Sequence, residues 1–128
     1  MWADTNILVR LITKSPTMQY QAVVQFLSQV SKPVFVHPAH VCEAMFVLEG
    51  NYYHYSALQA TQELALALSA TCFNVIDAAA IANTLRLYPA SNLDFSDVLI
   101  CELARVNNDE VLSFDRKMSR LGVPIRQP

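Results

Sequence analysis

The sequence predicts an α/β fold in which helices cover both faces of a mainly parallel sheet, as a three-layer α/β/α sandwich. Two observations favour this class. Short runs rich in β-branched and aromatic residues alternate along the chain with longer segments whose apolar residues recur every three or four positions. Strands separated by helices need crossover connections, and these join parallel strands whose sheet is buried on both faces.

Four short runs predict the strands of this sheet. The first is a stub at Met1–Ala3, and the longer runs are Pro33–His37, Cys72–Ile76 and Val111–Phe114. Residues that interrupt regular structure bound these runs, as is typical of buried strands. Two helical segments follow each of the first three strands in this interpretation.

The segments between the strands have the spacing of helices that bury one face. The apolar positions with this spacing are Ile7, Leu8, Leu11 and Ile12, then Val23, Phe26, Leu27 and Val30, then Val41, Ala44, Met45 and Leu48. The run from Leu64 to Leu68 is apolar nearly all round. That run therefore predicts a helix that is buried, either inside the monomer or at an oligomer interface.

Capping residues support the predicted helices. Pro16 suits a first helical turn. Ser56 and Gln59 have the spacing of a capping box, in which each side chain bonds the backbone amide of the other residue. Gly122 can close the short helix that follows Asp115.

Composition limits both the organisation and the function. At 128 residues the chain is expected to form a single domain, residues 1–128. Only two residues are glycine, which leaves no material for a Gly-rich phosphate-binding loop. The formal net charge of −2 lacks the basic excess that indicates a polyanionic ligand.

The cysteines and the hydropathy pattern predict a soluble cytoplasmic protein. Cys42, Cys72 and Cys101 are widely spaced and odd in number, as is typical of thiols in a reducing compartment. The longest uncharged apolar stretch, Leu64–Ile76, is shorter than the ~18 residues of a membrane span. The first residues lack the basic start and apolar run of a signal peptide.

Acidic residues follow several of the predicted strands. Asp4, Asp77 and Asp115 come directly after strands, and Glu43 lies one helical turn past another. Ligands of parallel sheets bind at the carboxyl ends of the strands, where these side chains would converge. Converging carboxylates repel one another, and a hard cation such as Mg²⁺ or Mn²⁺ would offset that repulsion. A single Asp after a strand is more often a helix N-cap, so only the convergence favours a metal site.

Four segments carry a resemblance to a known family. They are Asp4–Arg10 (D-T-N-I-L-V-R), Val41–Glu49 (V-C-E-A-M-F-V-L-E), Asp94–Ile100 (D-F-S-D-V-L-I) and Ser113–Lys117 (S-F-D-R-K). Their order and spacing resemble the four motifs of PIN-domain ribonucleases, most closely the toxins of VapBC toxin–antitoxin pairs. The resemblance covers essentially the whole chain and implies a PIN-like sandwich with a roughly five-stranded sheet.

The resemblance also implies the site and its chemistry. Asp4, Glu43, Asp97 and Asp115 would hold Mg²⁺ or Mn²⁺ and act as the catalytic acids of an endoribonuclease. Asn6 and Ser113 would support them. A small antitoxin protein and a second copy of the chain are the implied partners, with RNA as the substrate. Without these four acids, seven acids face nine Lys and Arg, a net charge of +2 for the rest of the molecule.

Asp94 competes with Asp97 for the role of direct metal ligand. Asp94 fits a helix N-cap, and Asp97 fits the third helical position, where a carboxylate is favoured by the helix dipole. Asp97 is preferred because the Asp of the family motif directly precedes the apolar V-L-I run, which leaves Asp94 as a supporting residue.

Basic residues concentrate late in the chain. They are Arg105, Arg116, Lys117, Arg120 and Arg126. The spacing of Arg116 and Arg120 places both on one helical face, which is either a solvated surface or a rim that contacts RNA phosphates. Arg116, Lys117 and Arg120 are the RNA-contact candidates.

Four other interpretations remain open. His37, His40 and Cys42 could bind zinc, although no fourth ligand has suitable spacing. The tyrosines of Tyr52–Tyr55 could stack RNA bases or simply cover the core. A PIN-like domain without catalysis could bind RNA or a protein partner. A phosphoacceptor receiver domain would need paired acids after the first strand and a Lys after the last strand, whereas this chain has Asp4 with Asn6 and ends in V-P-I-R-Q-P.

Overall fold

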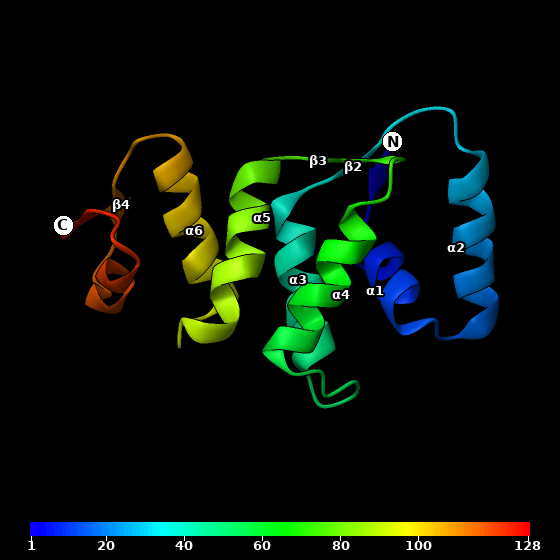
Figure 1. Ribbon diagram of the computed structural model, residues 1–128, viewed down its shortest axis with the longest axis horizontal. Coiled ribbons are helices and arrows are strands. Elements are labelled where there is room, and N and C mark those ends of the chain that lie inside the picture. Colours follow the sequence, from blue (N-terminus) through cyan, green and yellow to red (C-terminus); the bar gives the residue numbers. More distant parts are fainter. The chain divides into compact units, whose positions relative to one another are not determined.

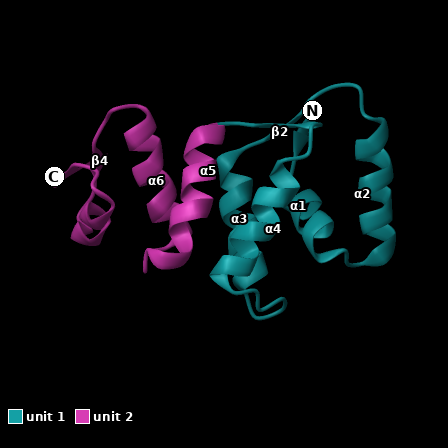
Figure 2. Ribbon diagram, viewed as in Figure 1, with its two compact units in different colours: residues 1–76 teal, residues 77–128 magenta.

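The structure is a computed structural model that describes residues 1–128. The chain divides into two compact units, residues 1–76 and residues 77–128 (Figure 2). Each unit is described by itself. No helix in either unit combines the length and the apolar character that a bilayer crossing needs.

Unit 1 is built from a parallel sheet and four helices (Figure 1). Its elements are β1 (Trp2–Ala3), α1 (Thr5–Thr13), α2 (Thr17–Gln29), β2 (Val34–Val36), α3 (Pro38–Glu49), α4 (Ala57–Leu68) and β3 (Phe73–Val75). The strand order is β1-β2-β3, with Ala3 opposite Val36 and Val36 opposite Val75. The first two strands are thus each followed by a helix pair, as the sequence predicts.

Local capping explains where the helices of unit 1 begin. Ser56 accepts a hydrogen bond from the Gln59 amide at 3.1 Å, which confirms the predicted N-cap of α4. His37 ends the β2 region by accepting a bond from the Ala39 amide, and Pro38 occupies the first turn of α3. Because these residues bond to the start of a helix, β2 is shorter than the predicted run.

The core of unit 1 lies between α1, α3 and α4. Leu8, Val41, Leu48 and Leu64 are all fully buried there. The predicted buried face of α2, in contrast, is wrong, because no residue of α2 is buried and Phe26 is 54% exposed. Among the helices α2 packs chiefly against α1, and packing against this one neighbour leaves the apolar positions of α2 only partly covered.

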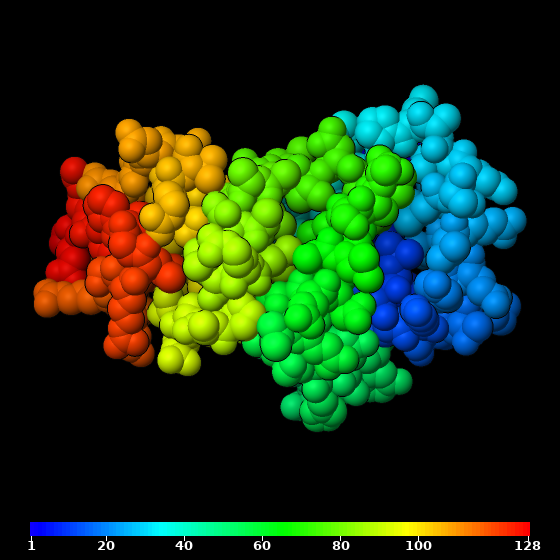
Figure 3. Space-filling model, in the orientation of Figure 1, coloured from blue at the N-terminus to red at the C-terminus, as the bar shows by residue number.

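The apolar run on α4 is also only partly covered. Leu64 is buried, whereas Leu66 is 70% exposed. Leu66 and Val24 line a groove of about 800 Å³ whose walls also include Leu11 and two lysines, Lys14 and Lys32. In Figure 3 the dark blue of α1 lies in the hollow between green α4 and the lighter blue of α2.

Unit 2 contains a helix pair and a small parallel sheet. Its elements are α5 (Ala78–Leu87), the 3₁₀ turn η1 (Tyr88–Ala90), α6 (Phe95–Val106), β4 (Val111–Leu112), the 3₁₀ helix η2 (Arg116–Leu121) and β5 (Ile125–Arg126). β4 pairs with β5, with Val111 opposite Ile125. Cys101, Met118 and Val123 belong to the core that joins α6 to this sheet.

The predicted fold class is confirmed, with one difference in the sheet. All strand pairs are parallel, which is consistent with an α/β/α sandwich. The five strands, however, lie in a three-stranded and a two-stranded sheet. β5 was not predicted from the sequence, because two residues beside Pro124 carry no alternation. Gly122 closes η2 at φ 72°, as predicted.

Candidate active site

Asp4 lies at the junction of β1 and α1 and is exposed. Its Oδ1 accepts a hydrogen bond from the Ile7 amide at 3.2 Å, so Asp4 is the N-cap of α1. Asn6 follows in the first turn and is also exposed. The capping role that a lone Asp suggests is therefore present, and an N-cap carboxylate keeps acceptor capacity for a further ligand.

Glu43 lies in the second turn of α3, and its side chain is 60% exposed. The hydroxyl of Thr5, in the first turn of α1, donates a short hydrogen bond to Glu43 Oε2. His40 Nδ1 lies 2.9 Å from Thr5 Oγ1 and 3.7 Å from Glu43 Oε2. Sequence reasoning missed Thr5 and His40, although the i, i+3 spacing of His40 and Glu43 places them on one helix face.

Asp97 lies in the first turn of α6 and is partly buried. Loss of hydration raises the pKa of the Asp97 carboxyl above its ordinary value, and the negative charges of Asp94 and Asp115 raise it further. A hydrogen bond from the Asp94 backbone offsets part of this effect. Unit 2 therefore places three of the predicted acids within electrostatic reach of one another.

Asp94 occupies the N-cap position of α6, as expected, but its side chain makes no capping hydrogen bond. Its backbone carbonyl accepts bonds from the amides of Asp97 and Val98 at 3.0 and 3.1 Å. The expected N-cap position of Asp94 is therefore confirmed, but the capping hydrogen bond of its side chain is absent, and the Asp94 backbone makes the contacts at the start of α6.

Asp115 caps η2 by accepting a hydrogen bond from the Lys117 amide at 2.8 Å. Ser113 Oγ accepts a bond from the Asp115 amide at 3.0 Å. Ser113 thus holds the backbone that carries the Asp115 carboxylate. No ion pair joins Asp94, Asp97 or Asp115 to a Lys or Arg side chain.

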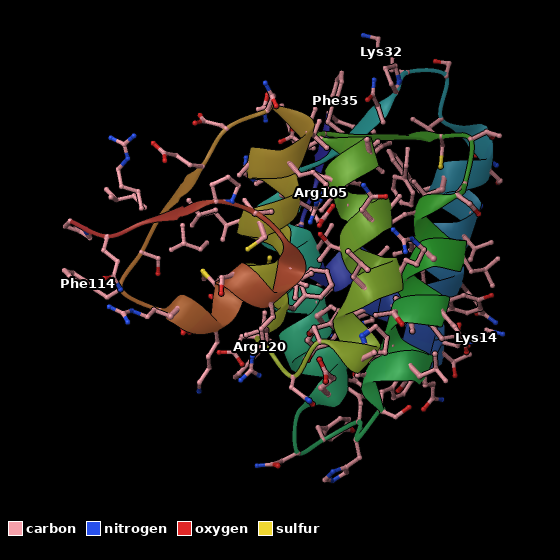
Figure 4. All side chains as sticks on the ribbon, turned by 60° about the vertical axis from the view of Figure 1, so that its left-hand side comes forward. Lys14, Lys32, Phe35, Arg105, Phe114 and Arg120 are labelled. Carbon is pink, nitrogen blue, oxygen red and sulfur yellow. The ribbon has the colours of Figure 1, made fainter.

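The late basic residues separate into two groups. Arg105 pairs with Glu102 at 3.1 Å, and Arg126 pairs with Glu110 at 2.5 Å. Those two arginines are therefore engaged within unit 2. The RNA-contact candidates Arg116, Lys117 and Arg120 are equally exposed, but none of them forms an ion pair in unit 2. Arg116 donates a hydrogen bond to Gln127 Oε1 at 3.1 Å. In Figure 4 the 77% exposed Phe114 lies at the left-hand edge of the view, and Arg120 lies below the ribbon of η2.

Asp77 is the strand-end acid that the family resemblance leaves out. It precedes α5 in a left-handed conformation, with φ 54°, and its side chain makes no capping hydrogen bond. Asp77 is not among the charges that raise the pKa of Asp97, which come from Asp94 and Asp115. Asp77 is therefore a suitable control position for variants of these acids.

The zinc interpretation finds no support in the geometry. His37 bonds to the helix backbone and His40 to Thr5. Neither unit brings three His, Cys, Asp or Glu side chains close enough to hold a metal. Cys42 is a free thiol whose pKa burial raises.

The aromatic cluster after α3 is ordered by edge-to-face contacts. Tyr52 and Tyr53 have ring centroids 4.8 Å apart, and Tyr53 and Tyr55 have centroids 6.4 Å apart. Arg10 donates to the Tyr53 hydroxyl at 3.4 Å. Tyr53 and Tyr55 are half-buried, whereas Tyr52 is 82% exposed. The cluster thus both covers unit 1 and presents one ring to solvent.

The family comparison covers nearly the whole chain. The sequence pattern of the PIN domain matches residues 1–124. The chain belongs to the PIN domain family. The PIN domain is an α/β fold, in agreement with the parallel strands of both units. A comparison with curated proteins gives no match. PIN domains are generally metal-dependent nucleases, so membership indicates a nuclease-type function with a nucleic acid as substrate.

Proposed function

We propose that this PIN domain is a Mg²⁺- or Mn²⁺-dependent endoribonuclease and that its two units act as one domain. The observation that carries the proposal is the group of Asp94, Asp97 and Asp115. Loss of hydration, and then the negative charges of Asp94 and Asp115, raise the pKa of Asp97, and no basic side chain pairs with any of the three acids. Neither unit by itself gathers three such side chains closely enough to hold a metal. Carboxylate oxygens are the ligands that Mg²⁺ and Mn²⁺ prefer, so the chemistry of these acids suits a hard cation.

The family motifs support Asp4, Glu43, Asp97 and Asp115 as the acids that would hold the cation, and Asp94 would support Asp97. When bound, the cation supplies positive charge that polarises a phosphoryl oxygen and promotes ionisation of an attacking water. An acid that is free of the cation would accept the proton of that water. Ser113 would keep Asp115 in place through the hydrogen bond to its backbone.

The exposed basic residues of η2 fit a role in RNA binding. Arg116 and Lys117 directly follow Asp115, one of the proposed metal ligands, and Arg120 lies in the same short 3₁₀ helix. Arg and Lys contacts to phosphates position a nucleic acid without reading its sequence. Their side chains are exposed, so they are accessible to a polyanion.

We further propose that the protein is the toxin of a toxin–antitoxin pair, that it forms a homodimer and that it acts in the cytoplasm. The groove beside Leu66 supports a partner, because its apolar walls suit the apolar face of an amphipathic segment. Its two lysines, Lys14 and Lys32, outnumber its one acid, Glu63, and so favour acidic residues on that segment. Free cysteines fit a reducing compartment. The molecular mass of the purified chain, measured by sedimentation, tests the homodimer. Co-purification with the product of the neighbouring gene tests the antitoxin complex.

The nuclease proposal is tested by incubating the purified full chain with a structured RNA, with Mg²⁺, with Mn²⁺ or with EDTA. Asp97→Asn removes a metal ligand while keeping the size of the side chain. Loss of a group that only supports a ligand already costs about 10- to 100-fold in activity, so we expect Asp97→Asn to lower cleavage by more than about 100-fold.

Asp77→Asn is the matched control, since Asn adopts the left-handed backbone of Asp77 without strain. We expect it to cleave RNA like the wild type. Cleavage in EDTA, or equal cleavage by Asp97→Asn and the wild type, would contradict the proposal. Binding of RNA with no cleavage by the wild type would favour the alternative, a catalytically silent PIN domain.

A further inference from the structure

Three polar side chains of unit 1 form a continuous chain of contacts that ends at Glu43. His40 Nδ1 lies 2.9 Å from Thr5 Oγ1, and the Thr5 hydroxyl donates to Glu43 Oε2. His40 and Glu43 belong to α3, whereas Thr5 belongs to α1, so the contacts cross between two helices that pack together.

The number of protons on each group determines the direction of these hydrogen bonds. A hydroxyl group has one proton to donate, and Thr5 donates it to the Glu43 carboxylate. Thr5 Oγ1 can therefore only accept from His40. A neutral imidazole donates from one nitrogen and accepts at the other, so His40 must carry its proton on Nδ1.

The reverse direction is unfavourable. If His40 Nδ1 accepted the Thr5 proton, Glu43 Oε2 would face an oxygen lone pair unless the carboxyl itself carried a proton. Two acceptors at hydrogen-bond distance repel each other, and the contact would open. The observed contacts thus define one tautomer of His40 and one orientation of the Thr5 hydroxyl.

Burial makes the donor rigid while the acceptor stays accessible. Thr5 is only 8% exposed and sits between the cap residue Asp4 and the buried Leu8. The Glu43 side chain is 60% exposed. No hydrogen bond occupies Glu43 Oε1, so the contact restrains one carboxylate oxygen and leaves the other open to solvent.

We propose that His40 is a positioning residue for Glu43: through Thr5 it fixes the orientation of the carboxylate that takes part in cation binding. This inference rests on the proposed metal-dependent function. A ligand held in one orientation loses less conformational freedom when a cation binds, so the affinity is higher than for a freely rotating side chain.

The tautomer of His40 can be measured without metal or RNA. The ¹⁵N chemical shifts of the imidazole, recorded on the full chain near neutral pH, report which ring nitrogen carries the proton. We expect Nδ1–H for His40 in the wild type and Nε2–H in Thr5→Val, which keeps the shape of Thr5 but removes its hydroxyl. An Nε2–H tautomer in the wild type would overturn the inference.

The consequence for the cation is measured by calorimetric titration with Mn²⁺ alone. We expect Thr5→Val and His40→Phe to weaken Mn²⁺ binding by about tenfold or more, as is typical for residues behind a ligand. Thr5→Ser and His40→Asn keep the hydroxyl and a donor near the Nδ1 position, so they should bind within about threefold of the wild type. Thermal melting verifies that each variant is folded.

His54→Asn is the control for loss of an imidazole elsewhere in unit 1, because His54 has a positive φ of 55° that Asn tolerates. It should bind Mn²⁺ like the wild type. If the wild type binds no Mn²⁺, the proposed function fails and the positioning role fails with it. If the wild type binds Mn²⁺ and the folded Thr5→Val and His40→Phe variants bind equally well, only the positioning role is overturned.

Discussion

The two units hold their acidic side chains in different ways. In unit 1 Asp4 and Glu43 each accept a hydrogen bond from a donor of α1, the Ile7 amide and the Thr5 hydroxyl. In unit 2 Asp115 also accepts a hydrogen bond, from the Lys117 amide, but Asp97 loses hydration and faces the charges of Asp94 and Asp115, so the pKa of Asp97 is raised. A carboxylate with a fixed donor is stable without a cation, whereas clustered carboxylates gain stability from added positive charge.

Unit 2 also contains the opposite case, an acid that is fully neutralised. Glu102 is only 1% exposed and pairs with Arg105, which also donates to the Leu121 carbonyl. Arg105 therefore joins α6 to the end of η2. Unit 2 thus contains both an acid that is paired with an arginine, Glu102, and acids that have no basic partner, such as Asp97.

Replacing Arg105, the partner of the buried Glu102, is expected to have the largest effect on stability. Arg105→Met leaves Glu102 buried without a partner, which should lower the free energy of unfolding by about 3 kcal/mol. The control is Arg126→Met, because Arg126 and Glu110 form an exposed pair worth less than about 1 kcal/mol. Urea unfolding followed by circular dichroism measures both. Equal losses in the two variants would refute the distinction.

A smaller effect is expected at the helix N-caps, where the Asp4 side chain makes a capping hydrogen bond and the Asp94 side chain makes none. Asp4→Ala deletes the acceptor for the Ile7 amide and should cost about 1 kcal/mol. Asp94→Ala should change stability by less than half of that, since the Asp94 side chain makes no capping bond. Asp4→Asn keeps the cap and serves as the control. The comparison is wrong if Asp94→Ala is the more destabilising variant in the same unfolding assay.

The smallest expected effect is a gain in stability. Asp97→Asn removes the repulsion from Asp94 and Asp115, so we expect the free energy of unfolding to rise by a few tenths of a kcal/mol at neutral pH without metal. The Asp97 carboxylate, which would stabilise the metal-bound protein as a metal ligand, would thus destabilise the metal-free protein. Thermal melts of the two proteins in EDTA measure the difference.

The pH dependence of this gain has a definite sign. The folded-state pKa of Asp97 is raised above the ordinary value of 3.8, so the folded chain takes up this proton at a higher pH than the unfolded chain. The cost of the charged side chain is therefore present in full above the folded pKa and is lost as the pH falls toward 3.8. The advantage of Asp97→Asn should shrink in that window, and an advantage that grows in acid would contradict the assignment.

Much of the local structure could be predicted because it depends on neighbouring residues. The cap at Ser56, the closure of η2 at Gly122 and the parallel crossover pattern all rest on interactions within a few residues or on the alternation of strands and helices. The motif acids are identified in the same way, since their order and spacing can be read along the chain. Family membership agrees with that interpretation.

The remaining features depend on residues that are distant in sequence. β5 forms because Val111 of β4 pairs with Ile125. Arg105 pairs with Glu102 in its own helix, but its second partner, the Leu121 carbonyl, lies 16 positions further along the chain. The contact between His40 and Thr5 spans 35 positions and arises only when α1 packs on α3. Local patterns specify what each segment can form, but burial and hydrogen-bond partners across the chain decide which side chains are held, which are exposed and which repel.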